Sequence, residues 1–234
     1  MDIFLLIIAF LIPYLLGSVN FSIVLSKAFK GDDIRNSGSG NAGATNMLRT
    51  YGKKFAILTL VLDILKGVAS VLFGALLTFL VSNYVVSVGN EGIAVSHSVF
   101  ARIQEQLPFY RYLSAVGVIL GHNFPLYFGF KGGKGVATSL GTILTLNWQV
   151  GLIVVLFAVA IMAVTRYVSL GSVMGAVIFV AVDLSYLIFT DGFSGGILVF
   201  DIIIAALLIL RHHQNIIRLI NGTENKLGSK KEGK

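Results

Sequence analysis

The sequence contains no cysteine, only three prolines and few charged residues. Without cysteine the chain can form no disulfide, no thiolate metal site and no cysteine nucleophile. Charged residues make up 12% of the 234 residues, whereas hydrophobic residues make up 56%. A typical soluble domain carries about 25% charged residues. These scarcities argue against an ordinary soluble domain and indicate an all-α integral membrane protein.

Seven hydrophobic segments are candidates for membrane-spanning helices, which need roughly 20 mostly apolar residues each. Two of the shorter segments flank the polar stretch 129–135, and we interpret them as abbreviated helices that carry this stretch into the protein. A re-entrant pair, giving five spans, is the alternative. The sequence thus predicts about seven spans in a single membrane-embedded domain, residues 1–234. The segments are 3–25, 55–82, 113–128, 136–146, 150–164, 172–189 and 195–210.

Lysine and arginine are distributed unevenly among the connecting segments. If the N-terminus is outside, segments 26–54, 129–136, 165–171 and 211–234 lie inside and hold fifteen of the 18 basic residues. This bias follows the positive-inside rule. We therefore expect a cytoplasmic tail over 211–234 and an external loop over 83–111, part of which, 93–107, could form a surface helix. The net charge of +7 then indicates basic loops beside anionic lipid and substrate rather than nucleic-acid binding.

The first polar inner segment contains the pattern G-x-G-x-x-G at Gly38, Gly40 and Gly43. A dinucleotide site would need a βαβ unit around it, but a hydrophobic helix and a charged loop precede it. Closely spaced glycines still let backbone N–H groups approach an anion, and a helix beginning near Asn41 would direct its positive end there. The alternative is a glycine turn before an ordinary capped helix. Nearby side chains suited to phosphate are Ser39, Asn41, Thr45, Asn46 and Arg49.

The second polar inner segment, 121–138, places Lys131 and Lys134 among glycines. The Walker pattern G-x-x-x-x-G-K-[ST] is not met, because Gly129 comes one residue too close to Gly133 and a glycine follows Lys134. Two lysines in a glycine-rich turn between short helices nevertheless predict an anion site. A plain positive-inside anchor, the alternative, would not require glycine at positions 132, 133 and 135.

The remaining polar positions are spread along the chain. His212 and Asn215 are spaced i, i+3 on a predicted tail helix and share a face, whereas adjacent histidines point apart and do not predict a metal site. Asp63 and Lys66 have the same spacing within a span and can form an ion pair. Two further aspartates within spans, Asp183 and Asp201, suit either a proton path or hydrogen bonds to neighbouring helices.

Five of these segments together resemble the bacterial acyl-phosphate:glycerol-3-phosphate acyltransferase family, the PlsY type. They occur in the family's order over most of the chain, although the loop 83–111 is longer than the family pattern. The resemblance implies seven transmembrane helices with the motifs on cytoplasmic loops at the bacterial inner membrane. It also implies acyl transfer from acyl phosphate to the sn-1 hydroxyl of glycerol-3-phosphate, without cofactor or metal. The segments are 37–49, 63–67, 121–138, 165–172 and 212–228.

The resemblance also implies roles for individual residues, with Arg49 and His212 placing the glycerol phosphate. The residues implied to line the catalytic centre are Ser39, Arg49, Lys134, His212 and Asn215. Those implied to bind the substrates are Gly38, Gly40, Asn41, Gly43, Thr45, Asn46, Lys131, Gly132, Gly133, Gly135, Ser169 and Ser172.

Two questions of chemistry stay open at the level of sequence. His212 is one candidate for the general base, and the substrate phosphate is the other, because no Ser-His-Asp arrangement is visible. The chain also lacks H-x-x-x-x-D, the signature of acyl-CoA-using glycerolipid acyltransferases. The competing functional classes are a transporter of a phosphorylated metabolite, for which inverted repeats would be expected, and a lipid-binding scaffold.

Overall fold

A computed structural model describes residues 3–90, 97–190, 192 and 194–228, with the backbone alone for 85–90 and 97–107. Throughout these residues the regular structure is helical. The chain forms two compact units, residues 1–146 and 147–234, and each is described by itself. The prediction of an all-α protein is confirmed for the described part of the chain.

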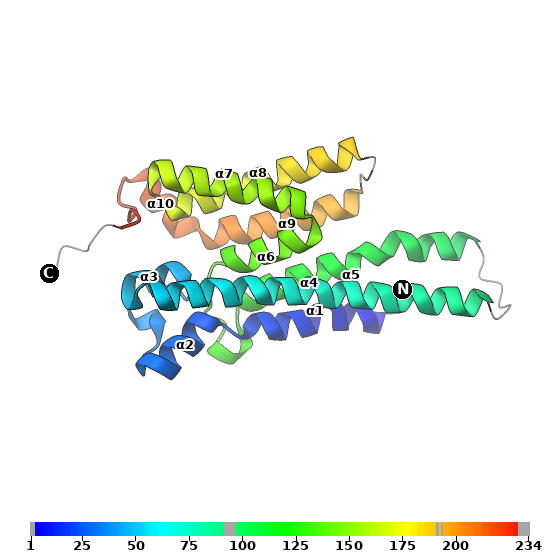
Figure 1. Cartoon of the computed structure of the whole chain (residues 1–234), viewed down its shortest axis with the longest axis horizontal. Coiled ribbons are helices and arrows are strands. Elements are labelled where there is room, and N and C mark those ends of the chain that lie inside the picture. Colours follow the sequence, from blue (N-terminus) through cyan, green and yellow to red (C-terminus); the bar gives the residue numbers. More distant parts are fainter. Residues whose placement is uncertain (1–2, 91–96, 191, 193, 229–234) are drawn as a thin grey trace. The chain divides into compact units, whose positions relative to one another are not determined.

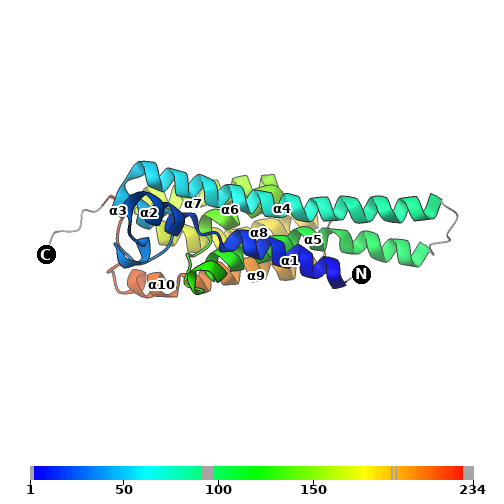
Figure 2. The ribbon, with the colours of Figure 1, turned by 90° about the horizontal axis from the view of Figure 1, so that it is seen from below.

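In the first unit, α1, α4 and α5 pack side by side, and α6 packs against α4 and α5 (Figure 1). The short helices α2 and α3 lie at the end of this unit where α4 begins (Figure 2). The elements of the unit are α1 (Ile3–Ser18), α2 (Phe21–Lys30), the 3-10 helix η1 (Ile34–Asn36), α3 (Ala44–Tyr51), α4 (Lys53–Asn90), α5 (His97–Asn123), the 3-10 helix η2 (Leu126–Phe128) and α6 (Val136–Leu146).

Glycines set the close approach of α1 and α5. A Cβ at Gly117 or Gly121, which are one turn apart on α5, would overlap or crowd backbone carbonyls of α1, and one at Gly17 would overlap the carbonyl of Val118. Helices in lipid gain little from hydrophobic burial against one another. Their association depends instead on close van der Waals packing, which small residues at the interface allow. A second contact of this kind joins α4 and α6 at Gly67 and Gly141.

Gly121→Ala is expected to lower the free energy of unfolding by about 1–3 kcal/mol, the usual cost of overpacking. The added methyl group would meet the backbone of α1 at Tyr14 and Ser18, which cannot move away as a flexible side chain could. The measurement is the thermal unfolding midpoint in detergent. Gly195→Ala is the matched control, because nothing lies within 4 Å of its Cβ position, and equal midpoints for the two variants would contradict the packing account.

The first hydrophobic run, predicted as one span over 3–25, is one candidate span over Ile3–Lys30, but it is broken into two helices. The helix α1 ends at Ser18, and α2 begins after Asn20, whose side chain accepts a hydrogen bond from the backbone N–H of Ile23. Asparagine is a preferred residue at this position because it replaces a backbone acceptor that the helix start lacks. The run is apolar enough that hydropathy alone does not detect the break.

The segment 83–111 is mostly helical. It continues α4 to Asn90 and α5 from His97 onward, while residues 91–96 lie outside the described residues. The helix α5 is therefore longer than the abbreviated helix predicted over 113–128, and of the two helices that flank the polar stretch only α6 is short. That the segment 83–111 lies outside the membrane stays a prediction.

Four helical segments of the described residues are long and apolar enough to cross a membrane: Ile3–Lys30, Lys53–Tyr84, Trp148–Thr165 and Val168–Phe189. Two further helices, bent by 59° at His212, would make a fifth span if counted together. The helix Val136–Leu146 is apolar but shorter than these segments. The sequence predicts an abbreviated helix at this position. The membrane character is confirmed, and the count of seven stays a prediction.

The second unit consists of three apolar helices and a polar tail. The turn between the first two helices contains Arg166 with a φ of 63°, a conformation that is strained for a residue with a side chain. Arg166 binds the tail at Leu227 through both its backbone and its side chain. Its carbonyl accepts from Leu227 N–H at 2.7 Å, and its Nη2 donates to Leu227 O at 2.9 Å. The elements are α7 (Trp148–Thr165), α8 (Val168–Phe189), α9 (Gly195–Arg211) and α10 (His213–Ile220).

Candidate active site

The first glycine-rich loop, residues 31–43, is organised by the buried side chain of Asn46. Its Nδ2 donates to the carbonyl oxygens of Ile34 at 3.1 Å and Ser37 at 3.0 Å, and its Oδ1 accepts from Ser39 N–H at 2.9 Å. Gly38 has a φ of 62°, and a Cβ there would overlap Asn46 Oδ1. The glycine is therefore required by the packing of the loop on Asn46, and the loop holds Ser39 at the surface.

Arg35 joins this loop to the second one. Its Nη1 donates to the carbonyl oxygens of Phe128 at 2.8 Å and Lys131 at 3.0 Å, while Nε and Nη2 bind the two carboxylate oxygens of Asp33 at 2.9 and 2.7 Å. A bidentate arginine–carboxylate pair fixes the orientation of the guanidinium. Arg35 is thus a tether between the two predicted anion sites, a role that no pattern in the sequence indicates.

Asp33→Asn is expected to lower the thermal unfolding midpoint above about pH 4 and to have less effect at lower pH. The Arg35 guanidinium lowers the pKa of Asp33 from 3.8 to about 2. A carboxyl group whose pKa is depressed by folding contributes stability above its unfolded pKa and loses it as the pH falls through the folded pKa. The measurement is the midpoint of wild type and variant from pH 7 to 2, and a difference that does not change with pH would contradict this assignment.

The second loop folds around the buried residue His122. Gly133 N–H donates to His122 O at 3.1 Å and Gly132 N–H to Asn123 O at 3.2 Å. A Cβ at Gly132 would overlap His122 O, and one at Gly133 would overlap both the imidazole Nε2 of His122 and the carbonyl of Ala42. These two glycines therefore serve the packing of the loop on His122 and on the first loop.

The start of α6 completes the second loop. Gly135, with a φ of 80°, precedes the helix, whose first backbone N–H groups have no partner within the helix. Asn123 is fully buried beside Gly135, and neither polar atom of its side chain has a hydrogen-bond partner among the described residues. Lys131 is exposed and Lys134 half-buried. Cations, helix amides and unsatisfied polar groups together make this loop suited to an anion.

The predicted ion pair between Asp63 and Lys66 is confirmed, with Nζ and Oδ1 2.8 Å apart and both side chains buried. His122 Nδ1 lies 3.0 Å from the same ammonium group. A charged pair without water is costly unless further hydrogen bonds satisfy it. Lys66 meets this requirement through the carbonyl oxygens of Gly17 and Val19, at 3.2 and 3.0 Å.

In the second unit, the predicted site residues Ser169 and Asn215 meet at Glu224. One carboxylate oxygen of Glu224 accepts from Asn215 Nδ2 at 2.7 Å and Ser169 Oγ at 2.9 Å, and the other accepts from Arg218 Nε at 2.7 Å. Burial by itself raises the pKa of Glu224, but the hydrogen bonds from Arg218, Asn215 and Ser169 outweigh it and hold the pKa below its usual range. No pattern in the sequence points to Glu224 as a site residue.

His212 is buried at the joint between α9 and α10, and its Nδ1 lies 2.8 Å from the carbonyl oxygen of Leu208. Because a carbonyl can only accept, Nδ1 carries the proton in this contact and the lone pair of a neutral ring is on Nε2. Ser172, in contrast, donates to Val168 O within its own helix.

Comparisons with known proteins show the family to which the chain belongs. The family model described as "Glycerol-3-phosphate acyltransferase" matches residues 7–222, across both units. The chain belongs to the glycerol-3-phosphate acyltransferase family. It is an acyltransferase and an integral membrane protein.

Individual relatives match along almost their whole length. The glycerol-3-phosphate acyltransferase of Thermoanaerobacter pseudethanolicus is 40% identical over 222 residues, which cover 95% of this chain and 96% of the relative. That of Clostridioides difficile is 39% identical over 232 residues, covering 99% and 100%. The crystal structure of PlsY, an integral membrane glycerol 3-phosphate acyltransferase, in its glycerol 3-phosphate form is 37% identical, with a TM-score of 0.72 and coverage of 97% and 95%.

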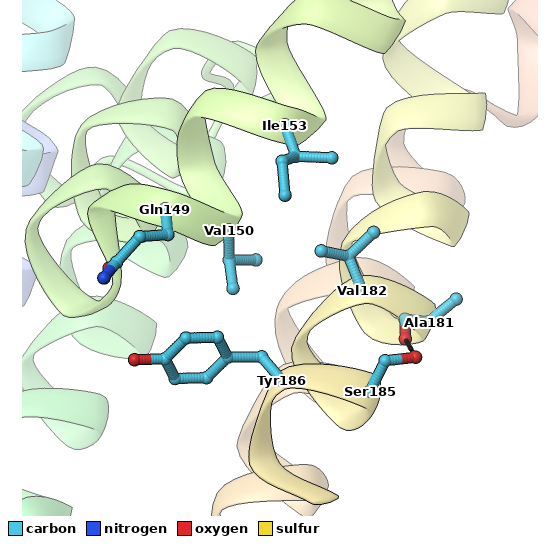
Figure 3. Close-up of a pocket in the computed structure, with 7 residues that line it drawn as sticks. All are labelled: Gln149, Val150, Ile153, Ala181, Val182, Ser185 and Tyr186. Atoms are coloured by element: carbon cyan, nitrogen blue, oxygen red, sulfur yellow. Dashed lines mark hydrogen bonds between the residues drawn. The ribbon is translucent and has the colours of Figure 1, made fainter. Parts of the chain in front are cut away.

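The acyltransferase also has an apolar pocket of about 360 Å³ on α7 and α8 (Figure 3). Its lining contains no charged side chain, so it is not a phosphate site. Counted along α8, it begins about 18 Å from Ser169 at 1.5 Å per residue. The pocket is therefore separate from the polar cluster around Glu224. It is lined by Gln149, Val150, Ile153, Ala181, Val182, Ser185 and Tyr186.

Proposed function

We propose that this acyltransferase moves a fatty acyl group from acyl phosphate to the sn-1 hydroxyl of glycerol-3-phosphate, giving lysophosphatidic acid and inorganic phosphate. The family supports the acceptor, and the related PlsY crystallised in a glycerol 3-phosphate form and a lysophosphatidic acid form supports acceptor and product. The observation that carries the proposal is the pair of glycine-rich loops tethered by Arg35. Two substrates that each carry a phosphate group require two anion sites.

The reaction needs little covalent chemistry from the protein. The hydroxyl oxygen of glycerol-3-phosphate attacks the carbonyl carbon of the mixed anhydride, the bond from that carbon to the phosphate oxygen breaks, and phosphate leaves with the electron pair. The hydroxyl proton passes to a base. Catalysis then consists mainly of positioning and of stabilising the negative charge that develops on the carbonyl oxygen.

The loops of the first unit supply groups for both tasks. We assign the phosphate of one substrate to the second loop, which contains Lys134 and the first amides of α6. Ser39 and Arg49 are exposed on the first loop and on α3, and the arginine fork suits a second phosphate. Asn46 acts by holding the loop that carries Ser39.

His212→Gln is expected to lower kcat while leaving KM for glycerol-3-phosphate near that of wild type. The hydrogen bond to Leu208 leaves the basic lone pair on Nε2, as a general base requires, and glutamine cannot accept a proton at neutral pH. Steady-state kinetics with varied glycerol-3-phosphate measure the two constants. Near-normal kcat with a raised KM would contradict the general-base role and would favour the substrate phosphate as the base.

We further propose seven spans, an external N-terminus, and an active site that faces the cytoplasm of a bacterial inner membrane. Basic residues concentrate in the segments that this topology places inside. Because the chain lacks cysteine, single cysteines at Asn221 and Gln104 can be labelled in intact cells with a reagent that does not cross the membrane. Labelling only at position 104 supports this topology, and labelling only at position 221 contradicts it.

The proposed reaction is tested by the structure of its product. Purified protein is incubated with palmitoyl phosphate and ¹³C-labelled glycerol-3-phosphate, and NMR locates the new ester before the acyl group can migrate. An ester on C1 is expected. An ester on C2, or consumption of palmitoyl phosphate without any ester, would refute the proposed acyl transfer to the sn-1 hydroxyl.

A further inference from the structure

A buried cluster of Asp63, Lys66 and His122 lies beneath both loops of the first unit. The ammonium group of Lys66 has four partners within 3.2 Å: Asp63 Oδ1, His122 Nδ1, and the carbonyl oxygens of Gly17 and Val19. These partners come from three helical segments, namely the end of α1, the helix α4 itself and the end of α5. Besides satisfying the buried ion pair, these contacts join the end of α1 and the end of α5 to α4.

On one side, the cluster leads to the first loop. Lys66 binds the last carbonyl groups of α1, and Asn20, which follows them, donates from Nδ2 to the carbonyl oxygen of Ala42 at 3.4 Å. The break between α1 and α2 is therefore held from within α4. The position of Ala42, in the turn between Gly40 and Gly43, depends on where this break is fixed.

On the other side, the cluster leads to the second loop. The carbonyl of His122 accepts from Gly133 N–H at 3.1 Å, and the imidazole Nε2 fills the space that a Cβ at Gly133 would need. The carbonyl oxygen of Ala42, from the first loop, borders the same space. Gly133 is thus the point where the two loops meet, and both sides of the contact trace back to Lys66.

His122 Nδ1 lies 3.5 Å from Asp63 Oδ1 and 3.0 Å from the ammonium of Lys66, and the shorter contact is the one with Lys66. An ammonium group has no lone pair, so it can only donate to Nδ1 of His122, and a neutral ring with its proton on Nε2 satisfies this contact. Asp63 and Lys66 then carry opposite charges and the ring carries none. The cluster adds no net charge to the membrane interior, where an unpaired charge is costly.

We propose that Lys66 is a positioning residue for the acyltransferase reaction, setting the spacing of the two glycine-rich loops through Asn20 on one side and His122 on the other. The substrate consequence rests on the proposed function, because it is expressed as affinity for glycerol-3-phosphate. Lys66 itself touches no substrate in this role.

The test compares two variants that avoid an unpaired buried charge. Asp63→Asn/Lys66→Met removes both charges together, and Lys66→Arg keeps the ion pair while its planar fork cannot reproduce the four contacts of the ammonium. Lys53→Met is the control, because Lys53 is an exposed lysine at the start of the same helix. Each protein is first examined for its thermal midpoint and for a single peak in size exclusion.

For folded variants, we expect KM for glycerol-3-phosphate to rise about 10- to 100-fold with a smaller change in kcat, since displacement of binding groups by about 1 Å can cost that much. The amides of Gly132 and Gly133 should also exchange hydrogen faster than in wild type, because their acceptors on His122 and Asn123 are no longer held. Lys53→Met should match wild type in both measurements.

Both readouts at wild-type values in folded variants would overturn the proposal. Failure of both variants to fold would also overturn it, in favour of a purely structural cluster. If wild type and Lys53→Met show no turnover, the proposed function fails, and hydrogen exchange of the second loop still decides whether Lys66 positions it.

Discussion

Gly133→Ala is expected to lower kcat/KM for glycerol-3-phosphate at least about 100-fold. Its Cβ would overlap the imidazole of the buried His122 and the carbonyl oxygen of Ala42. The His122 ring is held by Lys66, and the Ala42 carbonyl accepts a hydrogen bond from Asn20, so a shift of either group would break an existing contact. The second loop must then shift away from the first, and the phosphate groups that we propose these loops bind would lose their relative placement.

Gly31→Asn is the matched control for this substitution. Gly31 also lies in the first loop region and has a φ of 66°, which asparagine tolerates, and nothing lies within 4 Å of its Cβ position. Steady-state kinetics of both variants with varied glycerol-3-phosphate provide the comparison. Normal kcat/KM in folded Gly133→Ala protein would show that the contact between the loops is not needed for substrate binding.

Glu224→Gln is expected to lower kcat/KM about 10- to 100-fold by misplacing Ser169 and Asn215. The carboxylate accepts three hydrogen bonds, and glutamine offers one oxygen and two N–H donors in its place. Either Arg218 or the pair Ser169 and Asn215 then faces a donor. A buried donor left without a partner costs about 1–3 kcal/mol, although Arg218 is partly exposed and recovers hydration.

The pH dependence of the thermal midpoint shows whether Glu224→Gln acts through loss of the carboxylate charge or through altered packing. Because the pKa of Glu224 is lowered in the folded protein, its contribution to stability is present above its unfolded pKa and is lost as the pH falls through the folded value. The midpoints of wild type and Glu224→Gln should therefore converge on acidification. Thr223→Ala, at the exposed neighbouring position, is the control, and its thermal midpoint should equal that of wild type at every pH. If the midpoint of Glu224→Gln also equals that of wild type at every pH, the proposed role of the Glu224 network is contradicted.

The sequence predicts much of the fold because lipid imposes a simple pattern. The spans at 55–82 and 172–189 correspond to parts of α4 and α8, since long apolar segments in a chain with little charge have few alternatives. The break after Ser18 escapes this pattern. The break is capped by Asn20 and contacted by Lys66, 48 residues after Ser18, which binds the carbonyl groups of Gly17 and Val19.

The candidate site was predictable where glycine and cations cluster, and less so where single residues act at a distance. The sequence shows Gly132 and Gly133 but not that they pack on His122. Arg35 resembles any loop arginine until its contacts with the second loop are seen. Glu224 lies in a polar tail, where a carboxylate is ordinarily solvated, and only the fold brings Ser169 to it.

The most direct measurement is phosphate release from palmitoyl phosphate by the purified protein in lipid, with and without glycerol-3-phosphate, and with palmitoyl-CoA as the alternative donor. The account predicts release that requires glycerol-3-phosphate, matches lysophosphatidic acid formed mole for mole, and is absent with palmitoyl-CoA. Folded protein that forms lysophosphatidic acid only from palmitoyl-CoA, or that turns over neither donor, would contradict it.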